Sequence, residues 1–252
     1  MAEQKQEFKF PTEVVDLPSK GLVYPKDSPL SSGKIEIKYM TAKEEDILTS
    51  QNLIKKGVVI DRLLNSIIVT EGISTNDLLI GDKNAVMVAA RILAYGPEYT
   101  VEVENKYTGD KFSHTFDLTE CSFKELPEDV DYSKGEFETK LPVSNIDIKF
   151  KLLNGKEENQ IGEEIKKSNK FGMSTEMTTR LRHIITEVGG NSEQSTINNF
   201  VNNMLSKDSL YLRGEVQRLL PDIILKQEVD MEGELVEVDI PLTANFFWPS
   251  AV

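Results

Sequence analysis

The chain has 252 residues and 39% of them are hydrophobic, so it can bury an ordinary core. Its 29 Lys and Arg residues stand against 42 Asp and Glu residues, which gives a formal net charge of −13. This charge repels phosphate backbones and anionic lipid headgroups, so we expect no nucleic acid and no membrane surface as partner.

The cysteine count and the N-terminus indicate a cytoplasmic place of synthesis. Cys121 is the single cysteine, so it forms neither an internal disulfide nor a site with several thiolates. The first nine residues are polar and charged, which predicts no signal peptide. No segment approaches about 18 consecutive apolar residues, and a soluble protein is therefore expected.

The N-terminal third begins with irregular structure and then turns regular. The first ten residues predict a mobile arm, and the four prolines of Pro11–Pro29 predict an ordered loop with short extended pieces. Lys34–Tyr39 alternates apolar and charged side chains, as a half-buried strand does. Thr41 with Glu44 forms a capping box, which predicts a helix that begins there.

Further helices are expected before residue 100. The helix that begins at the capping box should run through about Lys55, and Val58–Val69 predicts another that ends by Gly72. Asp82 is the predicted N-cap of a third helix, within which Arg91 can pair with a carboxylate or a carbonyl. Both residues are therefore expected to support the fold.

The rest of the chain combines strands, helices and turns. The predicted strands are Tyr99–Glu104, Lys111–Asp117, Glu136–Lys140, Ile146–Leu153, Ile223–Val229 and Leu235–Ile240. The predicted helices are Lys156–Ser168, Thr175–Val188, Ser192–Met204 and Ser206–Leu220. Thr108-Gly109-Asp110 and Gly233 fit hairpin turns between the first and the last pair of strands.

These elements predict an α+β fold with a β-hairpin lobe, a helical second half and a C-terminal β-hairpin. We expect three parts. Residues 1–33 form the arm and ordered loop, residues 34–133 an α+β domain with the hairpin lobe, and residues 134–252 a helical domain that ends in a hairpin and an aromatic tail.

The residues that could perform catalysis are few. His114 and His183 have no partner at the spacing of metal ligands, and Cys121 lies in a predicted loop, so ordinary structural roles are expected for all three. The acidic pairs lie at helix starts or exposed faces, and no calcium loop or phosphate loop is present. The sequence therefore predicts no enzyme, no metal, no cofactor and no small-molecule substrate.

Apolar side chains at loops and ends are the more informative feature. Phe246, Phe247 and Trp248 lie within seven residues of the last residue given, and Leu22 and Tyr24 lie in the proline-rich loop. Either these side chains fold back and close the core, or they insert into a partner, as exposed aromatic residues do at interfaces. The five residues are our predicted partner contacts.

Four motifs lie in the first half of the chain: Leu17-Pro18-Ser19-Lys20-Gly21-Leu22-Val23-Tyr24-Pro25, Thr41-Ala42-Lys43-Glu44-Glu45-Asp46, Gly81-Asp82 and Arg91-Ile92-Leu93-Ala94-Tyr95-Gly96. Together they resemble the baseplate hub assembly proteins of T4-like contractile-tailed bacteriophages (myoviruses). The resemblance extends over residues 17–117, and the C-terminal hairpin with its Phe-Phe-Trp-Pro ending matches more loosely. Cysteine pairs that such proteins carry at hairpin turns are absent at 105–110 and 230–234, so no metal is predicted.

The resemblance implies a structural or assembly protein of the tail baseplate in the virion, assembled in the host cytoplasm. Such a protein binds other baseplate or tail proteins through non-covalent contacts and performs no catalysis. Two alternatives stay open: a transient assembly chaperone that is absent from the virion, and an enzyme that degrades the cell wall and would need a pair of carboxylates in a cleft.

Overall fold

The computed structural model describes residues 11–104, 109, 111–170, 175–231, 233–242 and 246–247. The α-helices are α1 (Ala42–Thr49), α2 (Gln51–Lys56), α3 (Val59–Ile67), α4 (Ile80–Tyr95), α5 (Gly155–Lys170), α6 (Glu176–Ile184), α7 (Gln194–Asn203) and α8 (Ser206–Leu219). The strands are β1 (Thr12–Asp16), β2 (Lys34–Lys38), β3 (Glu98–Glu104), β4 (Lys111–Asp117), β5 (Phe137–Lys140), β6 (Asp147–Phe150), β7 (Ile185–Val188), β8 (Lys226–Met231) and β9 (Glu234–Asp239). Short 3₁₀ helices lie at Pro29–Ser32, Leu118–Glu120 and Tyr132–Lys134.

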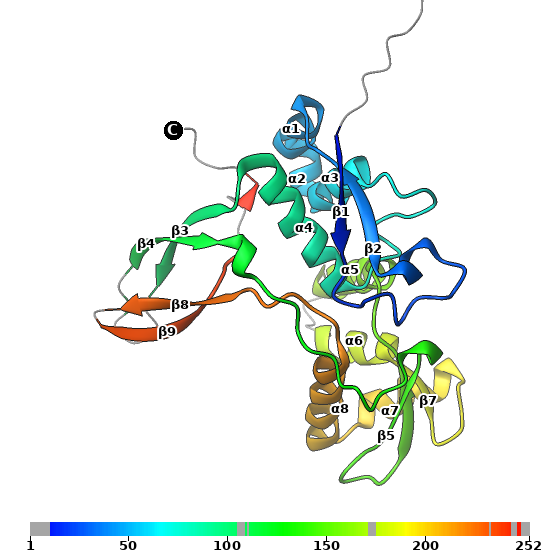
Figure 1. Ribbon diagram of the computed structural model, residues 1–252. Helices are drawn as coiled ribbons and strands as arrows, with labels where there is room; N and C mark the ends of the chain where they lie inside the picture. The colour runs from blue at the N-terminus through cyan, green and yellow to red at the C-terminus, as the bar shows by residue number, and fades with distance from the viewer. Residues whose placement is uncertain are drawn as a thin grey trace, which may run out of the picture.

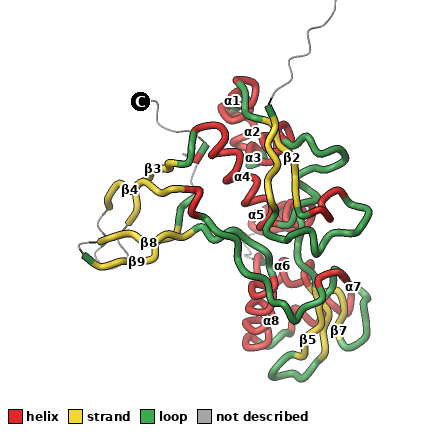
Figure 2. The backbone as a smooth tube through the Cα atoms, viewed as in Figure 1, coloured by secondary structure: helices red, strands yellow, loops and turns green. Residues whose placement is uncertain are grey.

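The predicted α+β class is confirmed. The strands form small antiparallel sheets: β1 pairs with β2, β3 with β4, and β8 with β9, while β6 lies between β5 and β7. Figure 1 shows the hairpins β3-β4 and β8-β9 side by side as a lobe, with α6, α7 and α8 gathered beside β5 and β7 in a second lobe. Figure 2 shows the loops that join the two lobes. Gly233 lies at the β8-β9 turn with a φ of +94°, as predicted.

Two clusters of buried side chains hold the molecule together. The first combines α1, α3, α4 and β2 with both hairpins, although the hairpins are more than 100 residues apart in the sequence. The second combines the sheet β5-β6-β7 with α5, α6, α7 and α8. Tyr24 packs against both clusters. The domain limits expected at residues 33 and 133 stay a prediction.

Two segments are not helical over their full predicted length, because their backbone groups pair with strands instead. The helix predicted over Thr175–Val188 is wrong at its end, where Ile185–Val188 forms β7 against β6. Its β-branched residues suit a strand once an edge is available. Similarly, α3 ends at Ile67, two residues before the predicted end at Val69, because Ile68 bridges to Ile37 and the amide of Val69 donates to the backbone oxygen of Glu36 at 3.0 Å.

The first predicted helix is divided in two. Ser50 has an extended backbone, so α1 ends before it and α2 begins after it, where one helix through about Lys55 was expected. Serine competes for backbone hydrogen bonds and is a poor residue for a helix interior. The Ser50 side chain makes no capping hydrogen bond here, so only its low helix propensity favours the break.

The predicted capping box at Thr41 and Glu44 is confirmed and extends into a buried network. The amide and hydroxyl of Thr41 donate to Glu44 Oε2 at 2.9 and 2.6 Å. Lys38 Nζ donates to Oε1 at 2.9 Å, and the Ser66 hydroxyl does so at 3.1 Å. Burial by itself would raise the pKa of Glu44, but the hydrogen bonds from Thr41 and Lys38 lower it to about 2. The carboxylate is thus held charged.

This network predicts a pH dependence of stability. The pKa of Glu44 is lower in the folded state, so its contribution is present above its ordinary pKa of 4.5 and is lost as the pH falls toward about 2. Glu44→Gln should lower the free energy of unfolding at pH 7 by about 1 to 2 kcal/mol. This value allows for the solvent that screens the charge of Lys38, the partner of Glu44. Urea unfolding from pH 2 to 7 measures it. Equal pH profiles for the variant and the natural chain would contradict this role.

Candidate interaction surfaces

The proline-rich loop presents Leu22 to solvent and uses Tyr24 as an anchor. Leu22 is 47% exposed. The Tyr24 hydroxyl donates to Asp82 Oδ2 at 2.5 Å and accepts from the amide of Leu79 at 2.9 Å. The amide of Ser19 donates to the other carboxylate oxygen of Asp82 at 2.9 Å. Of the two predicted contacts in this loop, Leu22 faces outward and Tyr24 fastens the loop to α4.

Asp82 is not the N-cap that the sequence predicted. Leu79 precedes α4, and Asp82 is its third residue, with a completely buried side chain that accepts hydrogen bonds from the loop instead of from its own helix. Burial raises the pKa of Asp82, although the hydrogen bonds from Tyr24 and Ser19 act in the opposite direction. Burial beside this carboxyl also raises the pKa of Tyr24. The pair therefore joins the loop to the helix.

Arg91 follows one of its two predicted alternatives. Its guanidinium donates to the backbone oxygens of Gly96 at 2.9 Å and Glu98 at 3.0 Å, so it pairs with carbonyls. These bonds fasten the end of α4 to the start of β3. The guanidinium also lies 5.2 Å from the centre of the Tyr95 ring.

Phe246 and Phe247 are enclosed by this chain. Their side chains are 1% and 2% exposed and belong to the first core. The ring of Phe246 meets that of Tyr99 edge to face at 5.1 Å and meets that of Phe247 at the same distance. The two rings thus fold back onto the core, and their contact with a partner stays a prediction. Trp248 lies outside the described residues.

Helix α8 is held at both ends. At its start, Asp208 accepts from the amides of Val143 at 2.8 Å and Ser144 at 3.0 Å. At its end, Lys124 Nζ donates to carbonyl oxygens of the last turn, those of Gln217, Arg218 and Leu220. Such a lysine satisfies carbonyls that a helix end leaves unpaired. These contacts give α8 a fixed position.

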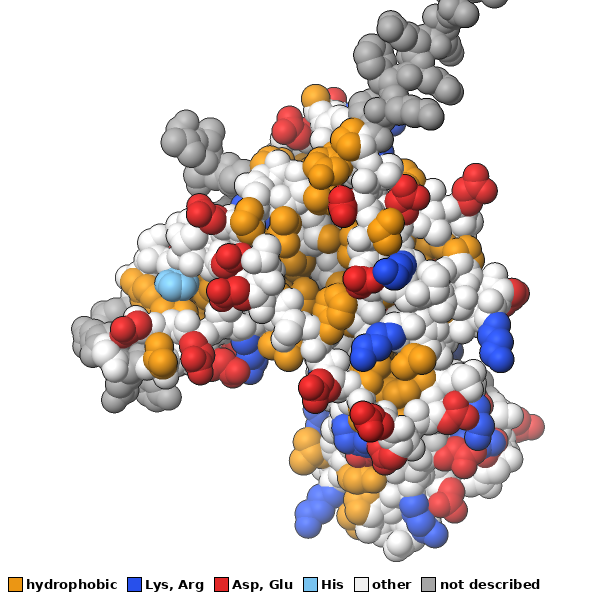
Figure 3. All heavy atoms as spheres, viewed as in Figure 1, with side chains coloured by type: hydrophobic (Ala, Val, Ile, Leu, Met, Phe, Trp, Pro, Cys, Tyr) orange, Lys and Arg blue, Asp and Glu red, His pale blue; other side chains and the backbone are white. Residues whose placement is uncertain are grey.

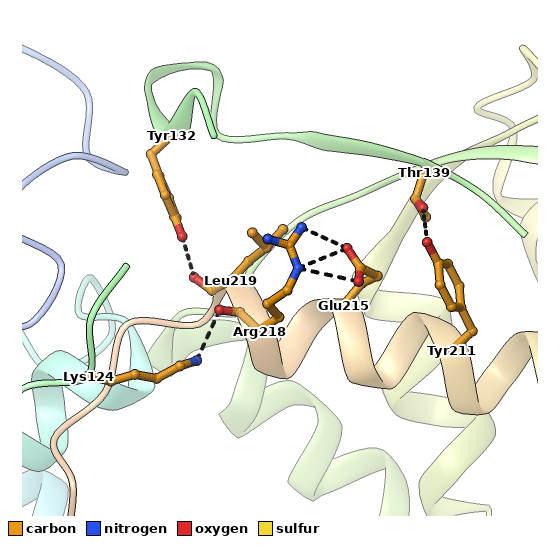
Figure 4. Close-up of polar contacts among 7 residues, drawn as sticks. All are labelled: Lys124, Tyr132, Thr139, Tyr211, Glu215, Arg218 and Leu219. Carbon is orange, nitrogen blue, oxygen red and sulfur yellow. Dashed lines mark hydrogen bonds and ion pairs between the residues drawn. The ribbon is translucent and has the colours of Figure 1, made fainter. Parts of the chain in front are cut away.

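Figure 4 shows further contacts along α8. The Tyr132 hydroxyl donates to the backbone oxygen of Leu219 at 3.1 Å. Closer to the start of the helix, the hydroxyls of Tyr211 and Thr139 lie 3.1 Å apart and join α8 to β5. The helix is therefore a fixed part of the second lobe.

Several apolar side chains on and around α8 face solvent. They are Leu205, Leu210, Tyr211, Val143 and, on α6, Met177. Figure 3 shows hydrophobic side chains next to Lys and Arg side chains over α8. A groove of about 470 Å³ lies between α6 and α8, lined by Glu176, Met177, Arg180, Leu181, Ile184 and Arg213. Exposed apolar side chains that gather in this way are typical of an interaction surface.

His114, His183 and Cys121 were considered for catalysis, and each has neighbours that suit a structural role. His114 stacks edge to face on Phe116 at 4.7 Å, and His183 Nε2 lies 3.1 Å from Glu164 Oε1. Burial raises the pKa of the Cys121 thiol, which disfavours the thiolate. Among the residues that the structure describes, no group of three or more His, Cys, Asp or Glu could hold a metal ion. Within the same residues, no helix has the length and apolar character that crossing a membrane requires.

Sequence reasoning missed the groove between α6 and α8. Leu210 interrupts an otherwise polar face of its helix, which is a weak signal for an exposed apolar residue. The groove itself depends on how two helices lie against each other, and periodicity within one helix carries no information on that.

The comparisons with known proteins give one match. A family model described as T4 bacteriophage base plate protein matches residues 12–248. No curated protein and no solved structure matches the chain. The family match extends across both cores.

Proposed function

This chain belongs to the T4 bacteriophage base plate protein family, and from that membership we propose that it is a structural or assembly protein of a phage tail baseplate that acts through non-covalent contacts, without catalysis. The observation that carries the proposal is the length of the match, which leaves no other domain of comparable size within these 252 residues. A place at the baseplate hub is part of the proposal and rests on the motifs at 17–25, 41–46, 81–82 and 91–96.

The partners proposed are other baseplate or tail proteins, met in the host cytoplasm and retained in the virion. Leu22 is the contact residue with the strongest support, because its exposed side chain is presented by a loop that Tyr24 and Asp82 hold in place. A preorganised loop loses less conformational entropy when it docks. Phe246, Phe247 and Trp248 remain proposed contacts, and the two phenylalanines would have to leave the core to act as such.

Mass spectrometry of purified virions, and of baseplates separated from them, tests this function. We expect the chain in fixed stoichiometry with other baseplate proteins in both samples. Abundance in the infected-cell lysate with absence from both samples would overturn the virion assignment in favour of a transient assembly chaperone. Release of cell-wall fragments by the purified chain would overturn the non-catalytic assignment.

Leu22→Asp tests the contact residue, with Ile54→Asp on α2 as its matched control, since Ile54 is exposed to a similar degree at 41%. Leu22→Asp should reduce incorporation into baseplates at least about tenfold, because a charge would be buried at the contact. Ile54→Asp should be incorporated normally. Thermal unfolding should be the same for both. Equal incorporation of the two variants would remove Leu22 from the contact.

A further inference from the structure

The sheet formed by β1 and β2 has two outer edges, and the chain itself covers the one on β2. The amide of Glu36 donates to the Thr70 hydroxyl at 2.9 Å. The backbone oxygen of Glu36 accepts from the amide of Val69 at 3.0 Å. The segment that follows α3 therefore satisfies the backbone groups that β2 turns away from β1.

The outer edge of β1 has no such cover among the described residues. The amide of Leu17 donates to the backbone oxygen of Gly33, which continues the antiparallel register of the sheet. In this register the odd-numbered residues of β1 turn their backbone groups toward β2, and Thr12, Val14 and Asp16 turn theirs away. The amide and carbonyl groups of these three residues bond to no other described residue.

Nothing in β1 protects this edge from pairing. Natural edge strands commonly carry a lysine, a proline or a bulge, each of which hinders the addition of another strand. The segment Thr12–Asp16 contains no lysine and no proline, and its pairing with β2 is regular. Four of its five residues are exposed, and Val14 is 55% exposed. An open edge with an exposed apolar side chain is a template for another strand.

The helix beside β1 also has apolar surface left to cover. α4 contacts β1, and Figure 1 shows it on the side of β1 away from β2. Ala89, Ile92 and Leu93 share one face of α4 and are only partly buried. Figure 3 shows hydrophobic side chains over α4. A molecule that pairs with β1 would exclude water from part of this surface.

A second copy of this chain matches the open edge in one register. A two-fold axis at Val14 places the Val14 side chains of the two copies opposite each other, and every outward amide then meets an outward carbonyl group. Asp16 of each copy lies opposite Thr12 of the other, and Glu13 lies opposite Val15. Each carboxylate therefore faces an uncharged residue, and no like charges are directly opposed.

Moving the two-fold axis by one residue in either direction removes this match. With the axis at Glu13, the two Glu13 carboxylates would lie directly opposite each other, which destabilises an antiparallel pair. With the axis at Val15, Thr12 would lie opposite Pro18, which has no amide to donate. The register centred on Val14 therefore uses the whole edge without opposing like charges.

We propose that two copies of this chain pair through β1 and form a two-fold symmetric dimer, with one antiparallel sheet in the order β2-β1-β1-β2. Lys34 lies 3.2 Å from Asp16 and offsets part of the negative charge at the junction. The paired strands are five residues long, which is short beside stable interfaces that bury about 1,200 Å² or more. We therefore expect an equilibrium between monomer and dimer. The pairing is a property of the chain alone and does not depend on the proposed function.

Analytical ultracentrifugation of the purified full chain tests the pairing. In about 0.15 M salt, we expect a mass that rises from one chain toward two as the concentration increases. Higher salt should strengthen the dimer, because each copy has a net charge of −13 and screening reduces their repulsion. The mass of a single chain at every concentration would overturn the proposal.

Charge substitutions at Val14 test the position of the two-fold axis. Val14→Lys and Val14→Glu should each weaken the dimer at least about tenfold, because two like charges would meet at the axis. A mixture of the two variants should dimerise more strongly than either variant alone, because a lysine then faces a glutamate. No gain on mixing would overturn the register.

Val143→Lys is the matched control for these substitutions, because Val143 is similarly exposed, at 46%, but lies in the second lobe. It should dimerise as the natural chain does. Equal weakening by Val143→Lys and Val14→Lys would show a general effect of charge and overturn the assignment to β1.

Val14→Pro tests the backbone hydrogen bonds. The amide of residue 14 points away from β2, so proline removes a donor that the fold does not use. The variant should keep the thermal unfolding of the monomer and lose the dimer. A dimer that persists in Val14→Pro uses another surface and overturns the proposal. If this variant fails to fold, the mixture of charge variants still decides.

Discussion

Phe246→Ala should lower the free energy of unfolding by about 3 to 5 kcal/mol, the range expected when a buried phenylalanine is truncated in a core. The ring is 1% exposed and meets Tyr99 and Phe247 edge to face, each at 5.1 Å. Truncation removes these contacts and leaves a cavity between the hairpin lobe and the tail. Urea unfolding at pH 7 measures the change.

Leu235→Ala is the control for this variant, because Leu235 lies on the neighbouring hairpin but is 69% exposed. Its effect should stay within about 0.5 kcal/mol. If Phe246→Ala also changed stability by less than about 1 kcal/mol and abolished incorporation into baseplates, the ring would be a docking element and its enclosure in the core would be dispensable. If Phe246→Ala lowers the free energy of unfolding but does not reduce incorporation into baseplates, the result supports a role for the ring in closing the core.

Gly81→Ala should destabilise the chain by about 3 kcal/mol or more, because the added methyl group has no space and only backbone can move. A Cβ atom at Gly81 would lie 1.9 Å from the backbone oxygen of Pro221 and 2.6 Å from the Cα atom of Asp222. Pro221 and Asp222 connect α8 of the second core with β8 of the first. In the alanine variant, the start of α4 must therefore move away from the Pro221-Asp222 segment.

Gly162→Ala is the matched control for this substitution. Gly162 lies within α5, and a Cβ atom there meets nothing within 4 Å. Alanine is the better helix former, so this change should stabilise the chain by about 0.5 to 1 kcal/mol. Urea unfolding of both variants gives the comparison. Similar effects at the two glycines would mean that α4 and the Pro221 segment are not in close contact.

Short-range patterns account for the elements that the sequence predicted well. The capping box at Thr41 and Glu44 needs residues three apart, and the hairpin turn at Gly233 needs one residue with a positive φ. The alternation of Lys34–Tyr39 likewise identifies β2 without knowledge of its partner. Arg91 donates to carbonyls only five and seven residues further along the chain, so a short stretch of sequence contains both partners.

Predictions failed where a segment distant in the sequence binds the side-chain or backbone groups that the local pattern assigned to a helix. Asp82 has the residue type of an N-cap, but the loop that carries Ser19 and Tyr24 takes its carboxylate. Ile185–Val188 continues a helical pattern, but β6 offers an edge to which it pairs. The energy of such contacts depends on residues tens of positions away, and a window along the chain does not contain them.

By itself, the sequence determined the α+β class, the position of most helices and strands, the two hairpins and the resemblance to phage baseplate proteins. Only the tertiary structure decided that both hairpins share the first core, that Phe246 and Phe247 close that core, and that a groove lined by apolar and charged side chains lies between α6 and α8. The physical reason is one of range. Turns, caps and periodicity are set by neighbours within a few residues, whereas burial and grooves arise from surfaces that meet only after the chain has folded.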